Sequence, residues 1–266
     1  MVSFPQLPGS RDSRALLGPL FELSGLGREL AGAVAGKFSS GGVTHEIARF
    51  RFNGSYAGHE PIRLGLFAGV HGDEPAGCAA LAQFLHALAA EPHRAAGYEL
   101  WVYPVVNPTG YAAGTRVNRA GKDLNREFWR GSSQPEVKLL EAELRDRRFD
   151  GLITLHADDT CEGLYGYSHG RPLDESLLRP ALSAAERVLP RDCRERIDGF
   201  AAKDGIIHDC FHGVLSAPPE QRPRPFDLIF ETPARAALAD QVAAAVAALD
   251  SVLARYRGFI AHAQYL

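Results

Sequence analysis

Short apolar runs alternate along this chain with longer stretches whose apolar residues recur every three or four positions. A short continuous apolar run is typical of a fully buried strand, and the longer spacing is typical of a helix. The runs that predict buried strands are 62–68, 98–106, 149–155 and 226–230. Since helical segments separate these runs, the pattern predicts a single-domain α/β/α sandwich.

Proline residues mark where three of the helices are expected to begin, because the first turn of a helix does not need the proline N–H. Pro75 precedes a face made of Cys78, Leu81, Leu85 and Leu88. A second helix is expected from Gln134–Pro135 to about Arg147, and Thr232–Pro233 is expected to start a long closing helix.

The segments between these elements carry weaker patterns. A turn at 39–42 lies between two strand-like runs, which predicts a hairpin at the edge of the sheet. Residues 111–131 form a long loop without a sustained period, and loops of that length inside a compact domain are usually functional. Residues 190–225 are rich in proline and irregular, so we expect a surface excursion there.

Charge and composition exclude several classes of protein. The net charge is −3, which leaves no electrostatic footprint for nucleic acid or a membrane surface. No apolar run reaches the length of a membrane span, and the first residues lack the apolar core of a secretory signal. The four cysteines are far apart, so we expect reduced thiols and a cytoplasmic protein.

Polar side chains follow the predicted strands at their carboxyl ends, where ligands bind in open α/β sheets. His71 and Glu74 follow the first strand, His156 follows the third and Glu231 follows the last. Two histidines and one glutamate can hold zinc and leave its fourth position open, which is the catalytic arrangement. Glu231 then suits the role of a general base outside the coordination shell.

Each of these residues also has a structural interpretation. Glu74 and Glu231 can stabilise the N-terminus of the helix that follows each of them. A lone histidine such as His156 after an apolar run is more often a buried structural residue. The combination of all four favours the metal centre.

The long loop contributes cationic groups. Arg116 and Arg126 lie a short distance apart in it, and an arginine fork binds a carboxylate through two hydrogen bonds. One of them can hold a substrate carboxylate while the other stabilises an oxyanion. The alternative is that these residues and Arg119 are charges facing solvent.

A set of motifs in fixed order resembles the zinc carboxypeptidase superfamily (peptidase family M14), particularly its small bacterial carboxypeptidases and murein peptide amidases. The motifs are HGDEPAG, NPTGY, TRVNRAGKDLNREF, LHADDT and FETP, within the stretch from Ile62 to the end. The resemblance implies a mixed, mostly parallel, twisted central sheet with helices on both faces. Since the sequence has no internal repeat and no dividing linker, we expect one domain over 1–266, with an N-terminal extension and edge hairpin in 1–60 and the catalytic core in 62–266.

The same resemblance implies a role for each site residue. One Zn²⁺ per chain is held by His71, Glu74 and His156. Arg116 lies on the scissile carbonyl, and Glu231 is general base and acid. The terminal carboxylate of the substrate is bound by Asn125 and Arg126.

The chain departs from the family pattern near the catalytic glutamate. Digestive relatives carry a mobile tyrosine there, but no tyrosine lies between Tyr167 and Tyr256. His208 or His212 can take that place. With Cys210 these histidines alternate, so on one strand they can form a second metal site. The alternative is a set of pH-sensitive or plain surface residues.

Negative charge gathers beyond His156, at Asp158, Asp159 and Glu162. These residues can favour a substrate with a free amine or a cationic side chain. Alternatively, Asp158 only orients His156 through its ring N–H. The residues around the departing side chain are expected within 190–225.

The leading hypothesis is a metallocarboxypeptidase that removes the C-terminal residue from a peptide. The expected partner is a peptide or acyl-amino-acid substrate with a free carboxylate. A related alternative is an N-acyl amino acid deacylase similar to succinylglutamate desuccinylase or aspartoacylase. Those relatives typically have HGNE rather than HGDE and continue into a further β domain, whereas one helix is expected after Glu231 here. A third alternative is a non-catalytic binding protein on the same fold.

Overall fold

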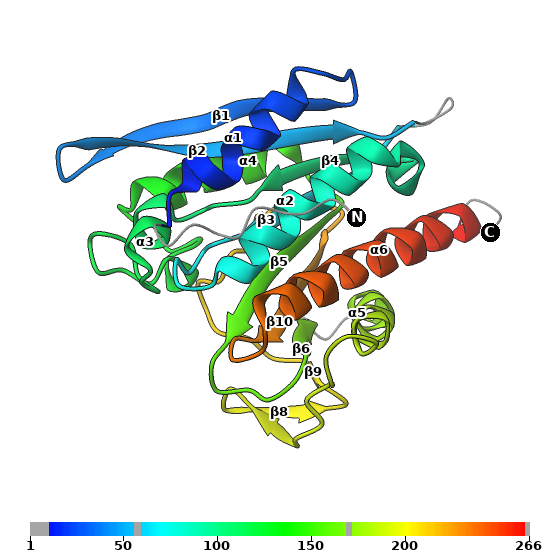
Figure 1. Ribbon diagram of the computed structural model, residues 1–266. Helices are drawn as coiled ribbons and strands as arrows, with labels where there is room; N and C mark the ends of the chain where they lie inside the picture. Colours follow the sequence, from blue (N-terminus) through cyan, green and yellow to red (C-terminus); the bar gives the residue numbers. More distant parts are fainter. Residues whose placement is uncertain (1–10, 56–59, 169–171, 264–266) are drawn as a thin grey trace.

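A mixed ten-stranded sheet forms the middle layer of the computed structural model, which describes residues 11–55, 60–168 and 172–263 (Figure 1). In spatial order its strands are β1 (Leu30–Ser40), β2 (Val43–Asn53), β4 (Tyr98–Tyr103), β3 (Ile62–Ala68), β5 (Gly151–Asp158), β10 (Phe226–Pro233), β6 (Tyr165–Ser168), β9 (Ile206–Ile207), β8 (Phe200–Lys203) and β7 (Arg196–Ile197). The four central strands β4, β3, β5 and β10 are parallel, and antiparallel pairs lie outside them. The predicted sheet is therefore confirmed.

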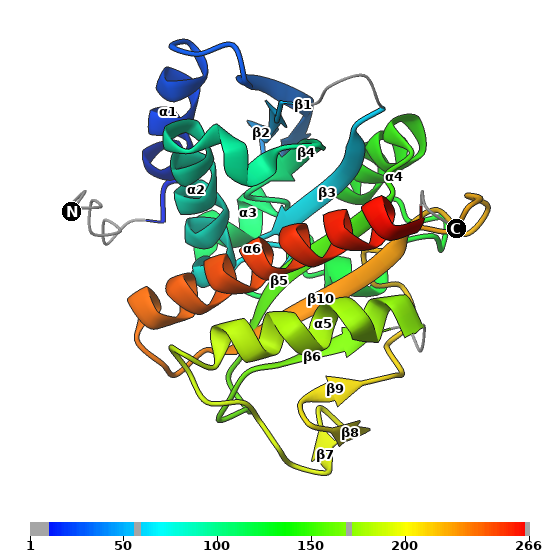
Figure 2. The ribbon, with the colours of Figure 1, turned by 90° about the vertical axis from the view of Figure 1, so that its right-hand side faces the viewer.

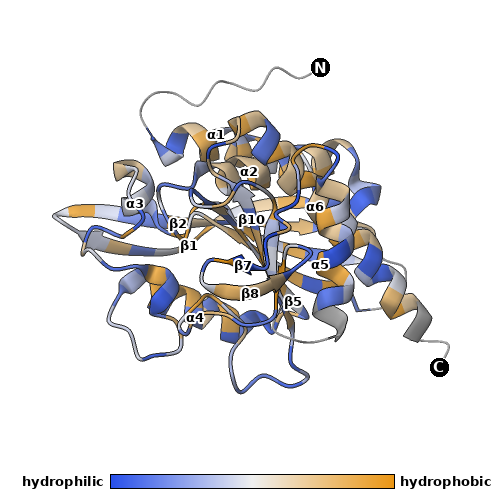
Figure 3. Ribbon diagram, turned by 90° about the horizontal axis from the view of Figure 1, so that it is seen from below, coloured by the Kyte–Doolittle hydropathy of each residue, from blue (hydrophilic) through white to orange (hydrophobic). Residues whose placement is uncertain are grey.

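Helices cover both faces of this sheet (Figures 1 and 2). On one face lie α1 (Ser13–Ser24), α2 (Pro75–Ala90), α5 (Pro172–Ala185) and α6 (Leu238–Ala263), whose apolar residues share one core with the strands. On the other face α4 (Pro135–Arg147) packs Val137, Leu140 and Leu144 into a second core. Figure 3 shows hydrophobic residues both on the strands and on the helices that pack against them, and hydrophilic residues in many of the loops.

The predicted strands form because their side chains are buried on both faces. In β5 seven consecutive residues are buried, and all eight residues of β10 are buried. Parallel strands covered by helices on both sides read as continuous apolar runs. The edge hairpin is also present as β1 and β2, joined through Gly41 and Gly42, which both have positive φ.

The strand order creates a switch point beside β3. The chain passes from β3 through α2 to β4 on one side, and β5 then pairs with the other side of β3. The carboxyl ends of two such strands leave a crevice between the connections that diverge from them. His71 follows β3 and His156 lies in β5, so the topology brings two predicted site residues to this crevice.

Two sequence predictions are wrong. Thr232–Pro233 does not start the closing helix, because β10 continues to Pro233, which pairs with Asp158 of β5, and α6 begins at Leu238. Residues 190–225 are not simply an irregular excursion, since they contain β7, β8 and β9, which extend the sheet beyond β6.

The long loop is more ordered than its sequence suggests. The short helix α3 (Pro108–Ala113) overlaps the beginning of this loop, and the 3-10 helix η2 (Leu124–Arg126) lies within it. The Asn118 side chain organises the residues between them, since its Oδ1 accepts hydrogen bonds from the N–H groups of Ala120 and Lys122 at 3.1 and 3.0 Å. Within the described residues, every helix is too short or too polar to cross a lipid bilayer.

The loop after β3 rests directly on α3. Asn107 donates from its side chain to the Val70 carbonyl at 3.3 Å and accepts from the Gly110 N–H at 2.8 Å. Gly72 lies against Gly110 so closely that a Cβ on Gly72 would be 1.9 Å from the Gly110 carbonyl carbon. The position of His71 therefore depends on a glycine at 72.

We expect Gly72→Ala to lower the free energy of unfolding by about 1–3 kcal/mol, because two backbone segments would have to separate. Gly258→Ala is the matched control. Gly258 lies in α6 with no atom within 4 Å of its would-be Cβ, so alanine there should raise that free energy by roughly 0.5–1 kcal/mol. Urea unfolding of both variants measures the difference; equal values for the two would contradict the close contact.

Candidate active site

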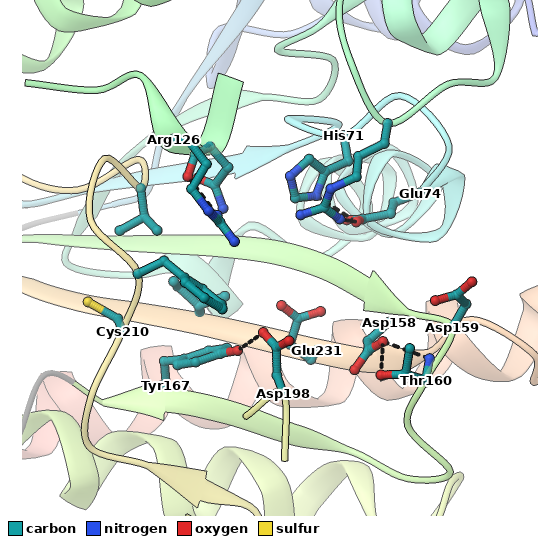
Figure 4. A pocket seen from close by; sticks show the side chains of 15 residues that line it. His71, Glu74, Arg126, Asp158, Asp159, Thr160, Tyr167, Asp198, Cys210 and Glu231 are labelled. Carbon is teal, nitrogen blue, oxygen red and sulfur yellow. Dashed lines mark hydrogen bonds and ion pairs between the residues drawn. The ribbon is translucent and has the colours of Figure 1, made fainter. Parts of the chain in front are cut away.

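Glu74 occupies the position that precedes α2, yet it does not cap this helix. Pro75 starts the helix, and the Glu74 side chain makes no capping hydrogen bond. Its carboxylate instead contacts both imidazoles: Oε1 lies 2.6 Å from Nδ1 of His71 (Figure 4), and Oε2 lies 2.8 Å from Nδ1 of His156. The helix-capping interpretation of Glu74 is therefore not supported.

The geometry of these three residues fits a metal ion. The potential ligand atoms of His71, Glu74 and His156 all lie within 4.8 Å of one another, and all three side chains are buried. The two Nδ1 atoms face the same carboxylate, and neutral imidazole nitrogens together with a carboxylate are typical zinc donors. The buried Nε2 of His156 has no hydrogen-bond partner among the described residues.

Asp123 supports this cluster, and the sequence analysis did not single it out. Its Oδ1 lies 3.0 Å from Nε2 of His71, and its Oδ2 accepts a hydrogen bond from Nε of Arg116 at 3.1 Å. A carboxylate on the far nitrogen of a ligating histidine fixes the tautomer and the ring orientation. One feature of the sequence could have identified Asp123 as a site residue, namely its position inside the GKDLNR motif, two residues before Asn125.

The charges of the cluster depend strongly on one another. Burial opposes protonation of His71, but the carboxylates of Glu74 and Asp123 outweigh it and raise the pKa of His71 to about 9. Burial lowers the pKa of His156, although its Nδ1 contacts the Glu74 carboxylate. Burial would raise the pKa of Glu74, but the two imidazoles outweigh it and lower that pKa to about 2. The site therefore holds an ionised carboxylate between two nitrogen donors.

Glu231 comes to the same site through strand register. It pairs with His156 across β10 and β5, so the two side chains project from the same face of the sheet. Glu231 is 9% exposed. Burial and the charges of Glu74, Asp158 and Asp198 raise the pKa of Glu231 well above its usual value.

Asn125 and Arg126 are held by the segment that precedes β10. The Leu215 N–H donates to Oδ1 of Asn125 at 2.9 Å, which leaves the amide NH₂ of Asn125 available to a ligand. The guanidinium of Arg126 stacks on Phe211, 4.0 Å from the ring centroid. Both residues are therefore positioned before any substrate arrives.

One cavity of about 210 Å³ joins these groups (Figure 4). Six of the seven predicted site residues line it, namely His71, Glu74, Arg116, Asn125, Arg126 and Glu231. His156, the seventh, is buried against Glu74. The cavity is also lined by residues that the sequence analysis did not propose, including Tyr167, Asp198 and Phe211.

Comparison with known proteins agrees with this geometry. The sequence profile of the succinylglutamate desuccinylase/aspartoacylase catalytic domain matches residues 61–157. Among curated proteins, none matches this sequence with significance. A solved structure from Shewanella denitrificans, provisionally named a metallopeptidase, is 26% identical with a TM-score of 0.76, and the match covers 92% of this chain and 90% of that one.

Two carboxypeptidase structures share the fold. A metallo-carboxypeptidase from Burkholderia cenocepacia has a TM-score of 0.71 at 15% identity, over 93% of this chain and 69% of that one. A metallo-carboxypeptidase from Pseudomonas aeruginosa, solved with (2-guanidinoethylmercapto)succinic acid, has a TM-score of 0.67 at 16% identity, over 89% and 67%. This chain therefore shares the fold of these metallo-carboxypeptidases. It is an enzyme of the hydrolase type.

The two histidines considered for the place of the mobile tyrosine lie away from the cavity. His208 and His212 do not line the cavity, and His208 lies 3.7 Å from Glu175 of α5. Residues 208–212 do not form a strand, and among the described residues the one cluster suited to a metal is His71, Glu74 and His156. The hypothesis of a second metal site at 208–212 is therefore not supported.

The acidic residues beyond His156 lie partly at the cavity. Asp158 and Asp159 line it, whereas Glu162 is exposed outside it. Asp158 accepts hydrogen bonds from Thr160 and from the Tyr165 hydroxyl, while Nδ1 of His156 contacts Glu74. Asp158 is thus not the partner that orients His156.

We expect the purified protein to bind about one metal ion per chain and His71→Ala to lose it, because one of three buried ligands is removed. His93→Ala, an exposed histidine in the 3-10 helix η1 (Pro92–Ala95), is the matched control and should keep the metal. Inductively coupled plasma mass spectrometry after exhaustive dialysis gives the stoichiometry. A His71→Ala protein that retains one ion per chain would refute this ligand set.

Proposed function

We propose that this protein is a zinc-dependent metallocarboxypeptidase that hydrolyses the amide bond to a C-terminal residue. The observation that carries the proposal is the arrangement of three kinds of group around one cavity. A buried His–Glu–His cluster lies near a separate buried carboxylate, Glu231, and Arg126 stands at the same cavity. A metal site, a free base and a carboxylate-binding cation are the parts that carboxypeptidase chemistry needs.

His71, Glu74 and His156 would hold the zinc ion, since two imidazoles and one carboxylate leave a coordination position open. When bound, zinc supplies Lewis-acid chemistry: it lowers the pKa of water to about 7 and polarises a carbonyl oxygen. Asp123 keeps the His71 ring in place through its Nε2 atom.

Glu231 is proposed to accept a proton from the attacking water at its carboxylate and to deliver that proton to the departing amine. It suits this role because it lines the cavity without being one of the three clustered ligands. A divalent cation nearby would favour the ionised form that a base requires.

The cationic residues are proposed to orient the substrate. Arg116 lies 3.6 Å from Oε1 of Glu74, next to the metal site, where it can stabilise the oxyanion that develops on the scissile carbonyl. Arg126 and the amide NH₂ of Asn125 can bind the terminal carboxylate. The Pseudomonas aeruginosa relative, solved with a ligand that contains succinic acid, supports a carboxylate at this kind of site.

Glu231→Gln should retain the metal but lose at least about 1,000-fold in kcat, since the amide cannot accept the proton. Glu162→Gln, an exposed glutamate outside the cavity, is the control and should keep normal turnover. The comparison uses N-blocked dipeptides with zinc-loaded protein and a parallel metal assay. Normal hydrolysis by Glu231→Gln would place the base elsewhere.

Arg126→Ala should raise KM by roughly 10- to 100-fold for peptides with a free terminal carboxylate, because a charge-assisted contact is lost. Peptides with an amidated terminus should lose little. Arg119→Ala serves as the control, since Arg119 packs beside Gly41 in the edge hairpin rather than at the cavity. Equal losses for free and amidated peptides would contradict the role of Arg126.

The second candidate is an N-acyl amino acid deacylase, favoured by the profile match over residues 61–157. Both reactions cleave an amide next to a carboxylate-bearing product, so the same seven residues serve either one. A panel of N-blocked dipeptides, murein peptides and N-succinyl or N-acetyl amino acids separates them. Higher kcat/KM for the acyl amino acids would assign the deacylase.

A further inference from the structure

The cavity has walls of opposite charge (Figure 4). Arg126 lies on one side, and Arg116, from the same long loop, lines the cavity beside Glu74. Asp158, Asp159 and Asp198 lie across the cavity from Arg126, with Glu231 between Asp158 and Asp198. A cavity divided in this way suits a ligand that carries both a carboxylate and a cation.

Asp198 is placed at the cavity by a tight hairpin turn. The strands β7 and β8 are joined by Asp198 and Gly199, and Ile197 pairs with Phe200 across the turn. Both turn residues have positive φ, +50° for Asp198 and +83° for Gly199. Two positive φ values in a two-residue connection define a type I′ turn, for which Asp-Gly is a preferred sequence. The backbone conformation at Asp198 therefore has a local cause.

Aromatic contacts anchor this hairpin to the rest of the site. The Phe200 ring lies 4.8 Å from the ring of Phe211 and 6.2 Å from that of Tyr167, edge to face in both cases. Phe211 is the ring that supports Arg126. The turn that carries Asp198 is thus connected, through Phe200 and Phe211, to the arginine proposed to bind the substrate carboxylate.

The carboxylate of Asp198 is held by one oxygen only. The Tyr167 hydroxyl donates to its Oδ2 at 2.6 Å, and Oδ1 has no hydrogen-bond partner within the described residues. Asp158 differs, because Thr160 occupies its Oδ1 and Tyr165 its Oδ2. Asp198 is also exposed, so a ligand entering the cavity can reach it.

The surroundings of Asp198 fit a side chain with an apolar stem and a charged end. Ile229, Val214 and Phe211 line the same cavity and belong to one apolar cluster with Tyr167, the residue that holds Asp198. Lysine and arginine bury their methylene stems against apolar surface and keep the charged group at a polar one. Asp158 and Asp159 lie on the other side of Glu231 from Tyr167, away from this apolar wall (Figure 4).

We propose that Asp198, held by Tyr167, binds the cationic side chain of the departing residue, so that the enzyme prefers peptides ending in arginine or lysine. This inference rests on the proposed carboxypeptidase function. It assigns the terminal carboxylate to Arg126 and the ammonium or guanidinium of the same residue to Asp198.

The test compares kcat/KM for N-benzoylglycyl-arginine and N-benzoylglycyl-citrulline, which differ in charge but hardly in shape. Wild-type enzyme should prefer arginine by about 10- to 100-fold, the effect of one hydrogen bond to a charged group. Asp198→Asn should remove most of this preference and leave hydrolysis of the citrulline peptide within about threefold, because asparagine also favours the positive φ of the turn. Lysine and norleucine peptides give the second matched pair.

Asp204→Asn is the control variant. Asp204 and Gly205 form the equivalent Asp-Gly turn between β8 and β9, with positive φ at both residues, but Asp204 pairs with Arg179 and does not line the cavity. This variant should keep the arginine preference. A loss of the same size in Asp204→Asn would mean that the effect comes from the hairpin, which would overturn the assignment.

Two further outcomes would also overturn it. One is an equal loss on charged and neutral peptides in Asp198→Asn. The other is a loss in Asp198→Asn that affects only glycyl-citrulline, a dipeptide with a free α-amine. That result would mean that Asp198 binds the α-ammonium of the residue before the departing one.

The inference and the proposed function can fail separately. Calorimetric binding of L-arginine and L-citrulline to the zinc-loaded protein needs no hydrolysis, so it tests Asp198 even if no peptide is cleaved. Arginine should bind about tenfold or more tightly, and Asp198→Asn should abolish the difference. Equal binding of the two amino acids by the wild-type protein would reject the inference, whatever the enzyme hydrolyses.

Discussion

The site depends on one carboxylate that contacts two imidazoles. Glu74 reaches Nδ1 of both His71 and His156, and all three side chains are buried. Burying an ionisable group costs free energy unless the group is paired. An arrangement of the surrounding strands and loops that separated these three side chains would therefore be less stable. The contact forms only because β3 and β5 are neighbours that end at the same edge of the sheet.

Support for the cluster comes from outside the sheet. Asp123 joins His71 to Arg116, so these two side chains share one carboxylate. Asn107 fastens the loop after β3 to α3. His156 and Glu231 therefore lie on regular strands, while His71 and Glu74 lie in the turn between β3 and α2, which short polar contacts from loops hold in place.

The central strands and the three clustered residues could be predicted because one local signal marks them, an apolar run that ends in a polar residue. Asp123 could not be predicted, because its role depends on a contact with His71, which lies 52 positions away in the sequence. The Thr232–Pro233 prediction failed for a related reason. The local proline signal favours a helix start, but pairing with β5 continues through Pro233 and keeps the backbone extended.

The hairpin that carries Asp198 could not be predicted from the sequence alone. The two Asp-Gly pairs at 198 and 204 are strong turn signals, but the strands around them are only two to four residues long and have no clear alternation. Such strands are stable only when they add to an existing sheet edge, here that of β6. Asp198 therefore lies in a segment whose structure depends on the rest of the fold. His156 and Glu231 differ, because they lie on strands that the local sequence specifies.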